Sequence, residues 1–337
     1  MNRVRSEFIT MAGIALSALI IIGLPQFVEL FTIINATIYT SMAILALSLA
    51  LLWGFGGILC LGQTGFFGLG GYAYAVAAIN LGDSTPAVLI GVLVPAVFAA
   101  LVGYFMFWGR IADVYFAVIT LTITLILNTV FNSTAGDAYS IGTAALGGFN
   151  GMPSTPPLNL PWDTTVQLTP EQIWYVASAT LCLCYFSARG LLRTTFGRII
   201  VSIKENEART ELLGYDVRGY KLGLFMLCGG IAGLSGVLFA NCVFVSPTMF
   251  SLAYSAQVAI WVIVGGLGTL SGAIAGSVLV QMVTAELGRL EWLNPNFVLG
   301  LILVAFVLLI PGGLLPTLRK YISLVQGVRR NRDKQGG

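Results

Sequence analysis

The chain has 337 residues, of which 57% are hydrophobic and 9% are charged, and its mean hydropathy is +0.90. A typical soluble domain carries about 25% charged residues, so this composition excludes a soluble globular enzyme. Histidine, the commonest general base and metal ligand, is absent, and the net charge of +3 gives no indication of nucleic-acid binding. We therefore predict neither a metal site nor a nucleic-acid partner.

Long apolar runs follow one another along the chain and predict an all-α polytopic membrane protein with eight to ten transmembrane helices. About 20 apolar residues cross the hydrocarbon core as a helix, and only helices or closed barrels satisfy their backbone groups in lipid. The ten candidate spans are residues 8–24, 31–53, 63–82, 86–108, 112–131, 171–188, 219–241, 255–266, 271–285 and 296–316. Residues 255–285 form either two crossings or one re-entrant hairpin, and both alternatives stay open.

The distribution of basic residues predicts the orientation of these spans within one transmembrane domain, residues 1–337. With ten crossings, sixteen of the seventeen Lys and Arg residues fall on the side of the termini, and only Arg289 lies opposite. Because cytoplasmic loops carry the excess of Lys and Arg, both termini are predicted to be cytoplasmic. The first apolar run is then a retained helix, and the connections are an external Pro- and Gly-rich loop (132–170), a cytoplasmic loop (189–218) and a cytoplasmic C-terminal tail (319–337).

Two apolar stretches, 54–75 and 264–276, contain many glycines. Each glycine weakens a helix by about 1 kcal/mol relative to alanine. Such stretches serve either close packing between helices or a helix break that lines a solute path. The sequence leaves both interpretations open.

The one long polar stretch inside the chain is "KENEARTELLGYDVRGYK", residues 204–221. Ala208 and Leu212 fall on one face of a predicted amphipathic helix over 199–213, and Glu207 and Glu211 fall on its polar side. Gly214 stands where a helix-ending residue in the left-handed conformation is expected. The alternative is a solvated loop with the usual cytoplasmic excess of basic residues.

The segment "ENEARTELLG" (205–214) resembles the cytoplasmic Glu-Ala-Ala…Gly loop of binding-protein-dependent ABC transporter permeases. In that family a short helix docks into a cleft on the ATPase subunit. Arg209 takes the place of the second alanine. The resemblance assigns ATPase docking to Glu205, Glu207, Ala208, Arg209, Leu212 and Gly214.

Further stretches are similar to the branched-chain amino acid permease family, over residues 40–312. They include "GFGGILCLGQTGFFGLGGYAYA" (54–75), "GGFNGMP" (147–153) and "VIVGGLGTLSGAIAG" (262–276). Glutamine at Gln63 resembles the urea and short-amide branch of this family, whereas the amino acid branch usually has a histidine there. The chain departs from the urea branch at Phe149, where an asparagine is usual, and near Leu121, where that branch tends to carry a glutamine.

The resemblance implies the permease of a heteromeric importer in a bacterial plasma membrane, with urea or a short amide as the favoured solute and branched-chain amino acids as the alternative. Its partners would be a sister permease, a periplasmic binding protein and two ATPases that hold ATP and Mg²⁺. No lysine follows a glycine, so this chain has no P-loop and needs no cofactor of its own. One alternative is a stand-alone channel or secondary carrier, which would not need the docking helix. The other is an intramembrane enzyme, and the chain lacks the catalytic groups that such an enzyme requires.

The candidate solute path consists of uncharged polar and aromatic side chains within the predicted spans. Neutral hydrogen-bonding groups suit a small uncharged solute, and intramembrane acids and bases are almost absent. A threonine in a helix often bonds only its own i−4 carbonyl, so each one has a purely structural alternative. The candidates are Gln63, Thr64, Phe67, Tyr72, Thr120, Thr124 and Asn128.

Overall fold

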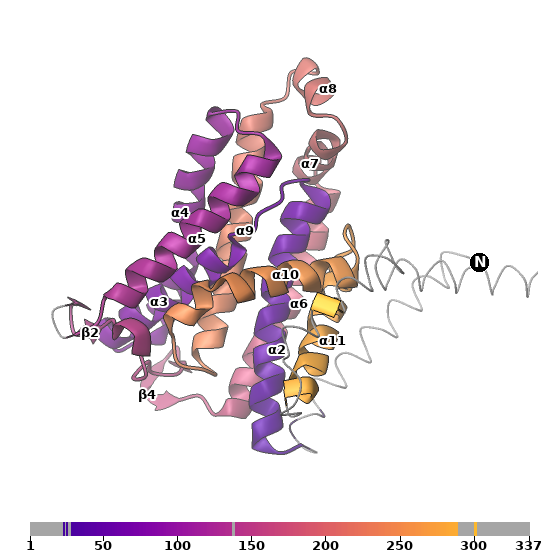
Figure 1. Ribbon diagram of the computed structural model, residues 1–337. Helices are drawn as coiled ribbons and strands as arrows, with labels where there is room; N and C mark the ends of the chain where they lie inside the picture. The colour runs from indigo at the N-terminus through magenta and orange to yellow at the C-terminus, as the bar shows by residue number, and fades with distance from the viewer. Residues whose placement is uncertain (1–22, 24, 26–27, 137–138, 289–299, 302–337) are drawn as a thin grey trace, which may run out of the picture.

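The computed structural model describes residues 23, 25, 28–136, 139–288 and 300–301, and these are mostly helical (Figure 1). The predicted spans 8–24 and 296–316 lie outside the described residues apart from isolated positions, as do Arg289 and the predicted tail 319–337. The prediction of an all-α polytopic membrane protein is confirmed.

Six helices in the described part are long and apolar enough to cross a membrane. They are α2 (Leu30–Leu49) with its continuation η1 (Ala50–Phe55), α4 (Ser84–Trp108), α5 (Asp113–Ser133), α6 (Pro170–Arg193), α9 (Val217–Ala240) and α11 (Leu270–Gly288). A further helix, α3 (Gln63–Leu81), packs against both α4 and α9, which also pack on each other.

Local capping residues determine where two of these helices begin. Asp83 accepts a hydrogen bond from the Thr85 amide at 2.9 Å and caps α4. Thr169 and Gln172 form a capping box at the start of α6, with Pro170 at the first helical position. These residue types satisfy the free amides of a first helical turn, so the starts of α4 and α6 lie close to their predicted positions.

Small residues bring α3, α4 and α9 into close contact. A Cβ on Gly70 of α3 would collide with the backbone of Gly233 on α9, and a Cβ on Gly236 would collide with the backbone of Phe67. On α4, a Cβ on Gly91 would meet Val237. Part of the glycine-rich stretch 54–75 therefore serves close helix packing, one of its two predicted interpretations.

The first part of the same stretch breaks the helix, as the other interpretation predicts. The chain leaves α2 through the π-helix η1, and Gly57 has a positive φ of 74°, which favours glycine. Residues 57–62 are not helical until α3 begins at Gln63. Non-helical backbone at membrane depth is tolerated where protein surrounds it, and Ile58 and Cys60 are buried.

A second break separates α10 (Leu252–Gly265) from α11, with Gly266 and Gly268 both at positive φ. With 14 residues, α10 is about 21 Å long, shorter than the roughly 30 Å hydrocarbon core. Figure 1 shows α10 lying across the direction of α2, whereas α11 runs along it. The helix α10 is therefore too short for a full crossing, whereas α11, with 19 residues, is long enough for one.

The long loop between α5 and α6 is ordered in its described residues. It contains two antiparallel pairs, β1 (Ser140–Ile141) with β2 (Ala144–Ala145) and β3 (Asn159–Leu160) with β4 (Asp163–Gln167), and the 3-10 helix η2 (Gly148–Asn150). The Met152 amide donates to Val245 O at 2.7 Å, and the Leu158 amide donates to Asn241 Oδ1 at 2.7 Å. The loop is thereby fastened to the segment that follows α9.

Candidate functional sites

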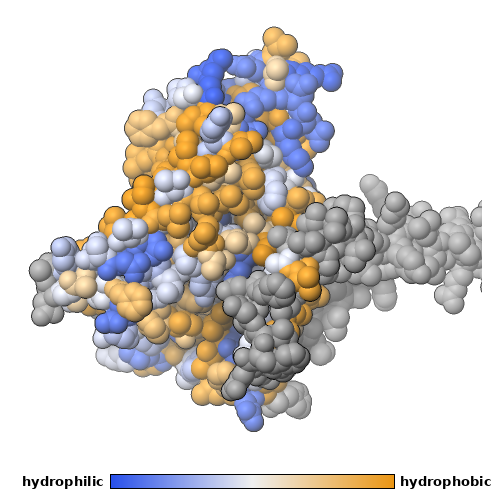
Figure 2. Space-filling view, in the orientation of Figure 1, coloured by the Kyte–Doolittle hydropathy of each residue, from blue (hydrophilic) through white to orange (hydrophobic). Residues whose placement is uncertain are grey.

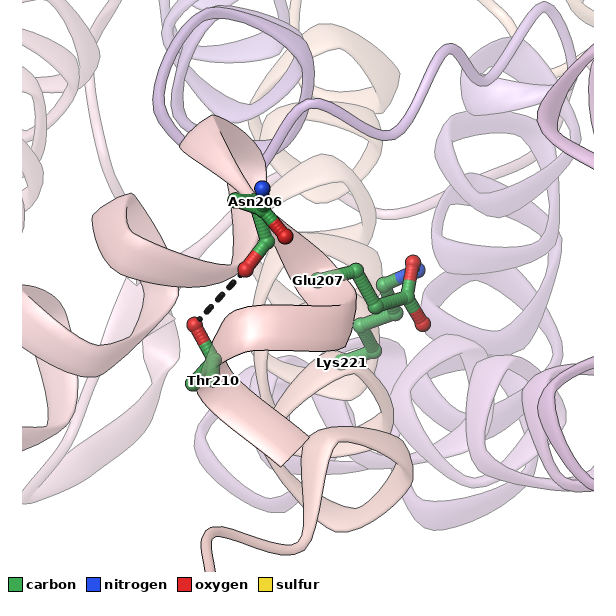
Figure 3. Close-up of polar contacts among 4 residues, drawn as sticks. All are labelled: Asn206, Glu207, Thr210 and Lys221. Carbon is green, nitrogen blue, oxygen red and sulfur yellow. Dashed lines mark hydrogen bonds and ion pairs between the residues drawn. The ribbon is translucent and has the colours of Figure 1, made fainter. Parts of the chain in front are cut away.

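The polar segment forms two helices, α7 (Thr195–Glu205) and α8 (Glu207–Leu212), so the predicted single helix over 199–213 is wrong. Asn206 separates them with extended backbone (φ −160°, ψ 100°), and its side chain accepts a hydrogen bond from the Arg209 amide at 2.9 Å. Its backbone oxygen accepts a hydrogen bond from the Thr210 hydroxyl at 3.0 Å, and Figure 3 shows this contact. Asparagine competes for backbone groups in this way and favours a helix start over a helix interior.

The two short helices differ in what they bury. In α7, Ile199, Ile200 and Ile203 pack into the core, whereas Thr210 is the buried residue of α8. The Leu212 side chain is 89% exposed, so the predicted apolar face of this segment points away from the chain's own core. Gly214 adopts φ +89°, the left-handed conformation predicted for it.

An ion pair holds α8 against the start of α9. Lys221 Nζ lies 2.6 Å from Glu207 Oε2, and Figure 3 shows the two side chains together. Arg110, in the turn between α4 and α5, lies 3.9 Å from Glu211, an exposed contact of little energetic value. A cavity of about 740 Å³ is lined by α8, by that turn and by the start of α9, and Ala208 is among its lining residues. Of the other docking candidates, Glu205 and Arg209 are exposed.

Basic residues gather at this end of the molecule. The eight Lys and Arg residues of the described part lie in the α4–α5 turn, the end of α6, α7, α8 and the start of α9. Figure 2 shows hydrophilic surface over α8 and hydrophobic surface over α4 and α5. The fold therefore places a polar end on an apolar body.

Two path candidates at the start of α3 bind its neighbours. Gln63 is buried, and its Nε2 donates to Ser48 Oγ of α2 at 2.9 Å and to Cys228 O of α9 at 3.2 Å. Among the described residues its Oε1 has no hydrogen-bond partner. The Thr64 hydroxyl lies 2.5 Å from the Ser255 hydroxyl of α10, and both are buried. The start of α3 is thus fixed to three helices.

The candidates on α5 mainly satisfy local backbone groups. Thr120 donates to Ala117 O at 2.9 Å, and Thr124 donates to Thr120 O at 3.0 Å and to Gly62 O at 3.3 Å. Half-buried Asn128 accepts a bond from Asn132 at 2.6 Å. These contacts correspond to the structural alternative for threonine.

The two aromatic candidates pack against other rings. Phe67 is fully buried, with its ring centroid 5.3 Å from that of Phe239. The Tyr72 ring packs against two phenylalanines, with its centroid 4.1 Å from that of Phe131 and 5.7 Å from that of Phe250. Tyr72 also lines a largely apolar cavity of about 570 Å³ between α3, α4 and the long loop, and its buried hydroxyl has no partner among the described residues.

The path candidates do not converge on one cavity. Gln63 faces α2 and α9, Thr64 faces α10, and Thr124 faces Gly62. The partners of Gln63 and Thr64, Ser48 and Ser255, could not be predicted from the sequence, because a lone serine in an apolar run does not indicate a tertiary contact. The described residues contain no group of three or more His, Cys, Asp or Glu side chains able to hold a metal ion.

Apolar helices of spanning length and the polar end at α8 define a polytopic membrane protein. Residues 30–309 match the family model "Branched-chain amino acid transport system / permease component", and the chain belongs to this family of ABC transporter permeases.

Curated relatives extend over most of the chain. The high-affinity branched-chain amino acid transport system permease protein LivM of Escherichia coli K12 is 29% identical over 332 residues, covering 91% of this chain and 75% of the relative. LivM of Salmonella typhimurium LT2 is 31% identical, covering 93% and 77%. The L-arabinose transport system permease protein AraH of E. coli K12 is 31% identical over 150 residues, or 41% of this chain and 44% of the relative. No solved structure matches.

Proposed function

We propose that this chain is the permease subunit of a binding-protein-dependent importer in a bacterial inner membrane, driven by ATP that partner subunits hydrolyse. Its partners are a sister permease, two ATPases and a periplasmic binding protein. The observation that carries the proposal is α8, a capped helix at the polar end whose apolar residues remain uncovered by this chain. The membership of an ABC permease family supports the same conclusion.

The ATPase is proposed to cover the apolar tip of α8. Leu212 and Leu213 are 89% and 66% exposed at the polar end, where no lipid tail would cover them. The Asn206 cap and the Lys221–Glu207 pair hold the helix in place for a partner. The eight basic residues at this end support a cytoplasmic location, the side on which ATP is available.

Substitution of Leu212 tests the docking. Burial of a leucine contributes about 1.5–3 kcal/mol, so Leu212→Lys should weaken co-purification of the ATPases by at least roughly tenfold. Phe149→Ser is the matched control, because Phe149 is also exposed, at 78%, but lies in the long loop. Solute uptake that persists after deletion of both ATPases would instead identify a stand-alone carrier.

For the solute, we favour urea or a short amide. The support is the glutamine at Gln63 and the uncharged character of the path candidates, since a neutral solute needs hydrogen bonds but no charge partner. Branched-chain amino acids are the second candidate, favoured by the relatives named LivM, which match over most of both chains.

Titration of the cognate binding protein with urea, acetamide and leucine distinguishes these solutes. Calorimetric binding of urea or acetamide without leucine binding is the expected result. Tight leucine binding without urea binding would favour the second candidate and leave the importer assignment intact.

A further inference from the structure

Lys204, in the last turn of α7, makes a hydrogen bond with a distant helix end. Its Nζ donates to Gly54 O at 2.7 Å, across 150 positions of sequence. Gly54 lies in the π-helix η1, whose final turn leaves carbonyl groups without helical donors. A lysine at such a terminus satisfies one carbonyl and complements the negative end of the helix dipole. Here the cap comes from the helix that immediately precedes α8.

Three elements meet at the residues that Lys204 contacts. A Cβ on Gly54 would lie 2.8 Å from Gly268 N, in the turn between α10 and α11. A Cβ on Gly56 would collide with Leu224 of α9, and one on Gly57 would lie 3.0 Å from Lys204 Cγ. A movement of Lys204 would therefore displace Gly54, whose backbone packs directly against the backbone of Gly268.

The same junction leads directly to the start of α3. Residues 57–62 connect η1 with Gln63 and Thr64, which bind Ser48, Cys228 O and Ser255. Beside the Lys204–Gly54 contact, a cavity of about 190 Å³ separates residues 56–58 from α7, α8 and the start of α5. The Lys204 hydrogen bond crosses from α7 to η1 next to this open space.

We propose that Lys204 is a positioning residue that couples movement of α7 and α8 to residues 54–62 and so to the start of α3. The inference rests on the proposed function, because it takes α8 as the ATPase-docking helix. Most π-helices are single-turn insertions in α-helices, and they are frequent at functional sites. Relaxation of η1 to an α-helix would shift the register of the residues that follow. The shift would be passed to Gln63 and Thr64.

Hydrogen exchange on the assembled transporter tests the coupling without knowledge of the solute. The permease is purified with its ATPases in lipid nanodiscs, and amide exchange over residues 56–66 is compared between the nucleotide-free and the ATP-vanadate-trapped complex. The variants are Lys204→Met, Lys204→Arg, which keeps a donor, and Arg198→Met. Arg198 is the matched control, an exposed cation of α7 that, among the described residues, donates only to Thr195 of its own helix, at 3.5 Å.

In the wild type, trapping should change exchange over residues 56–66. Lys204→Met should retain the ATPases, raise nucleotide-free exchange there about fivefold through loss of one hydrogen bond, and abolish the response to trapping. Lys204→Arg should restore the response, and Arg198→Met should behave as the wild type. A full response in Lys204→Met, or no response in a wild type that holds its ATPases, would overturn the inference. A wild type that binds no ATPases would instead overturn the proposed function.

Discussion

Gly65 of α3 lies directly opposite Thr124 of α5. A Cβ at this position would be 2.7 Å from Thr124 Oγ1, closer than side chains approach without displacement. Thr124 already donates to Gly62 O and to Thr120 O, so its hydroxyl has little freedom to move. At the residue scale, the close approach of α3 and α5 therefore requires that residue 65 be a glycine, which has no side chain.

We expect Gly65→Ala to destabilise the permease by about 1–3 kcal/mol through overpacking. Gly190→Ala is the control, because Gly190 is an exposed glycine of α6 with no atom within 4 Å of the added Cβ. It should be neutral or stabilising by up to about 1 kcal/mol. Thermal unfolding of both detergent-solubilised variants measures the difference, and an unchanged Tm for Gly65→Ala would show that the two helices can separate at no cost.

The sequence indicated that the neutral polar residues of α3 and α5 matter but not what they contact. Gln63 and Thr64 were selected as polar groups in apolar spans, and the structure joins them to Ser48 and Ser255. Adjacent residues point in different directions around a helix, so their partners depend on which helices pack on each side. That information is tertiary.

At the element scale, periodicity identified the polar segment but not its division. The apolar positions predicted one helix that continues through Asn206, although asparagine is a residue type that favours a helix start. The structure shows a local bond from the Arg209 amide to the Asn206 side chain, which replaces one helical hydrogen bond. The break leaves α7 packed in the core and α8 projecting.

In the two glycine-rich stretches, the backbone conformation of individual glycines likewise determines where each helix begins and ends. The stretches 54–75 and 264–276 were recognisable as irregular from composition. The structure divides the first between a π-helix, a non-helical connection and a closely packed α3. In the second stretch, α10 ends at Gly265, because Gly266 and Gly268 take positive φ values.

At the scale of the whole molecule, the polar end at α8 and the long loop between α5 and α6 lie at opposite ends of α9. Val217 is the first residue of α9, beside α8. At the other end, Asn241, just after α9, accepts a hydrogen bond from the Leu158 amide of the loop. A helix of 24 residues is about 36 Å long, enough to cross the hydrocarbon core. We therefore propose that the two ends lie on different sides of a membrane.

Cysteine labelling tests which side is which. In a background with the five native cysteines replaced, Trp162→Cys and Leu213→Cys each provide one exposed thiol, at sites with 86% and 66% exposure. A membrane-impermeant maleimide should label Trp162→Cys on intact spheroplasts and Leu213→Cys only after permeabilisation. The reverse pattern would invert the proposed orientation and place α8 out of reach of a cytoplasmic ATPase.

By itself the sequence determined the membrane class, the approximate helix positions, the sorting of basic residues to one end and the polar segment with its terminal glycine. These follow from composition and short-range pattern, because water and lipid act on each residue locally. Only the tertiary structure decided that Lys204 caps Gly54 and that the path candidates face different neighbours. Such contacts join residues far apart in the chain, so their geometry depends on how the helices pack.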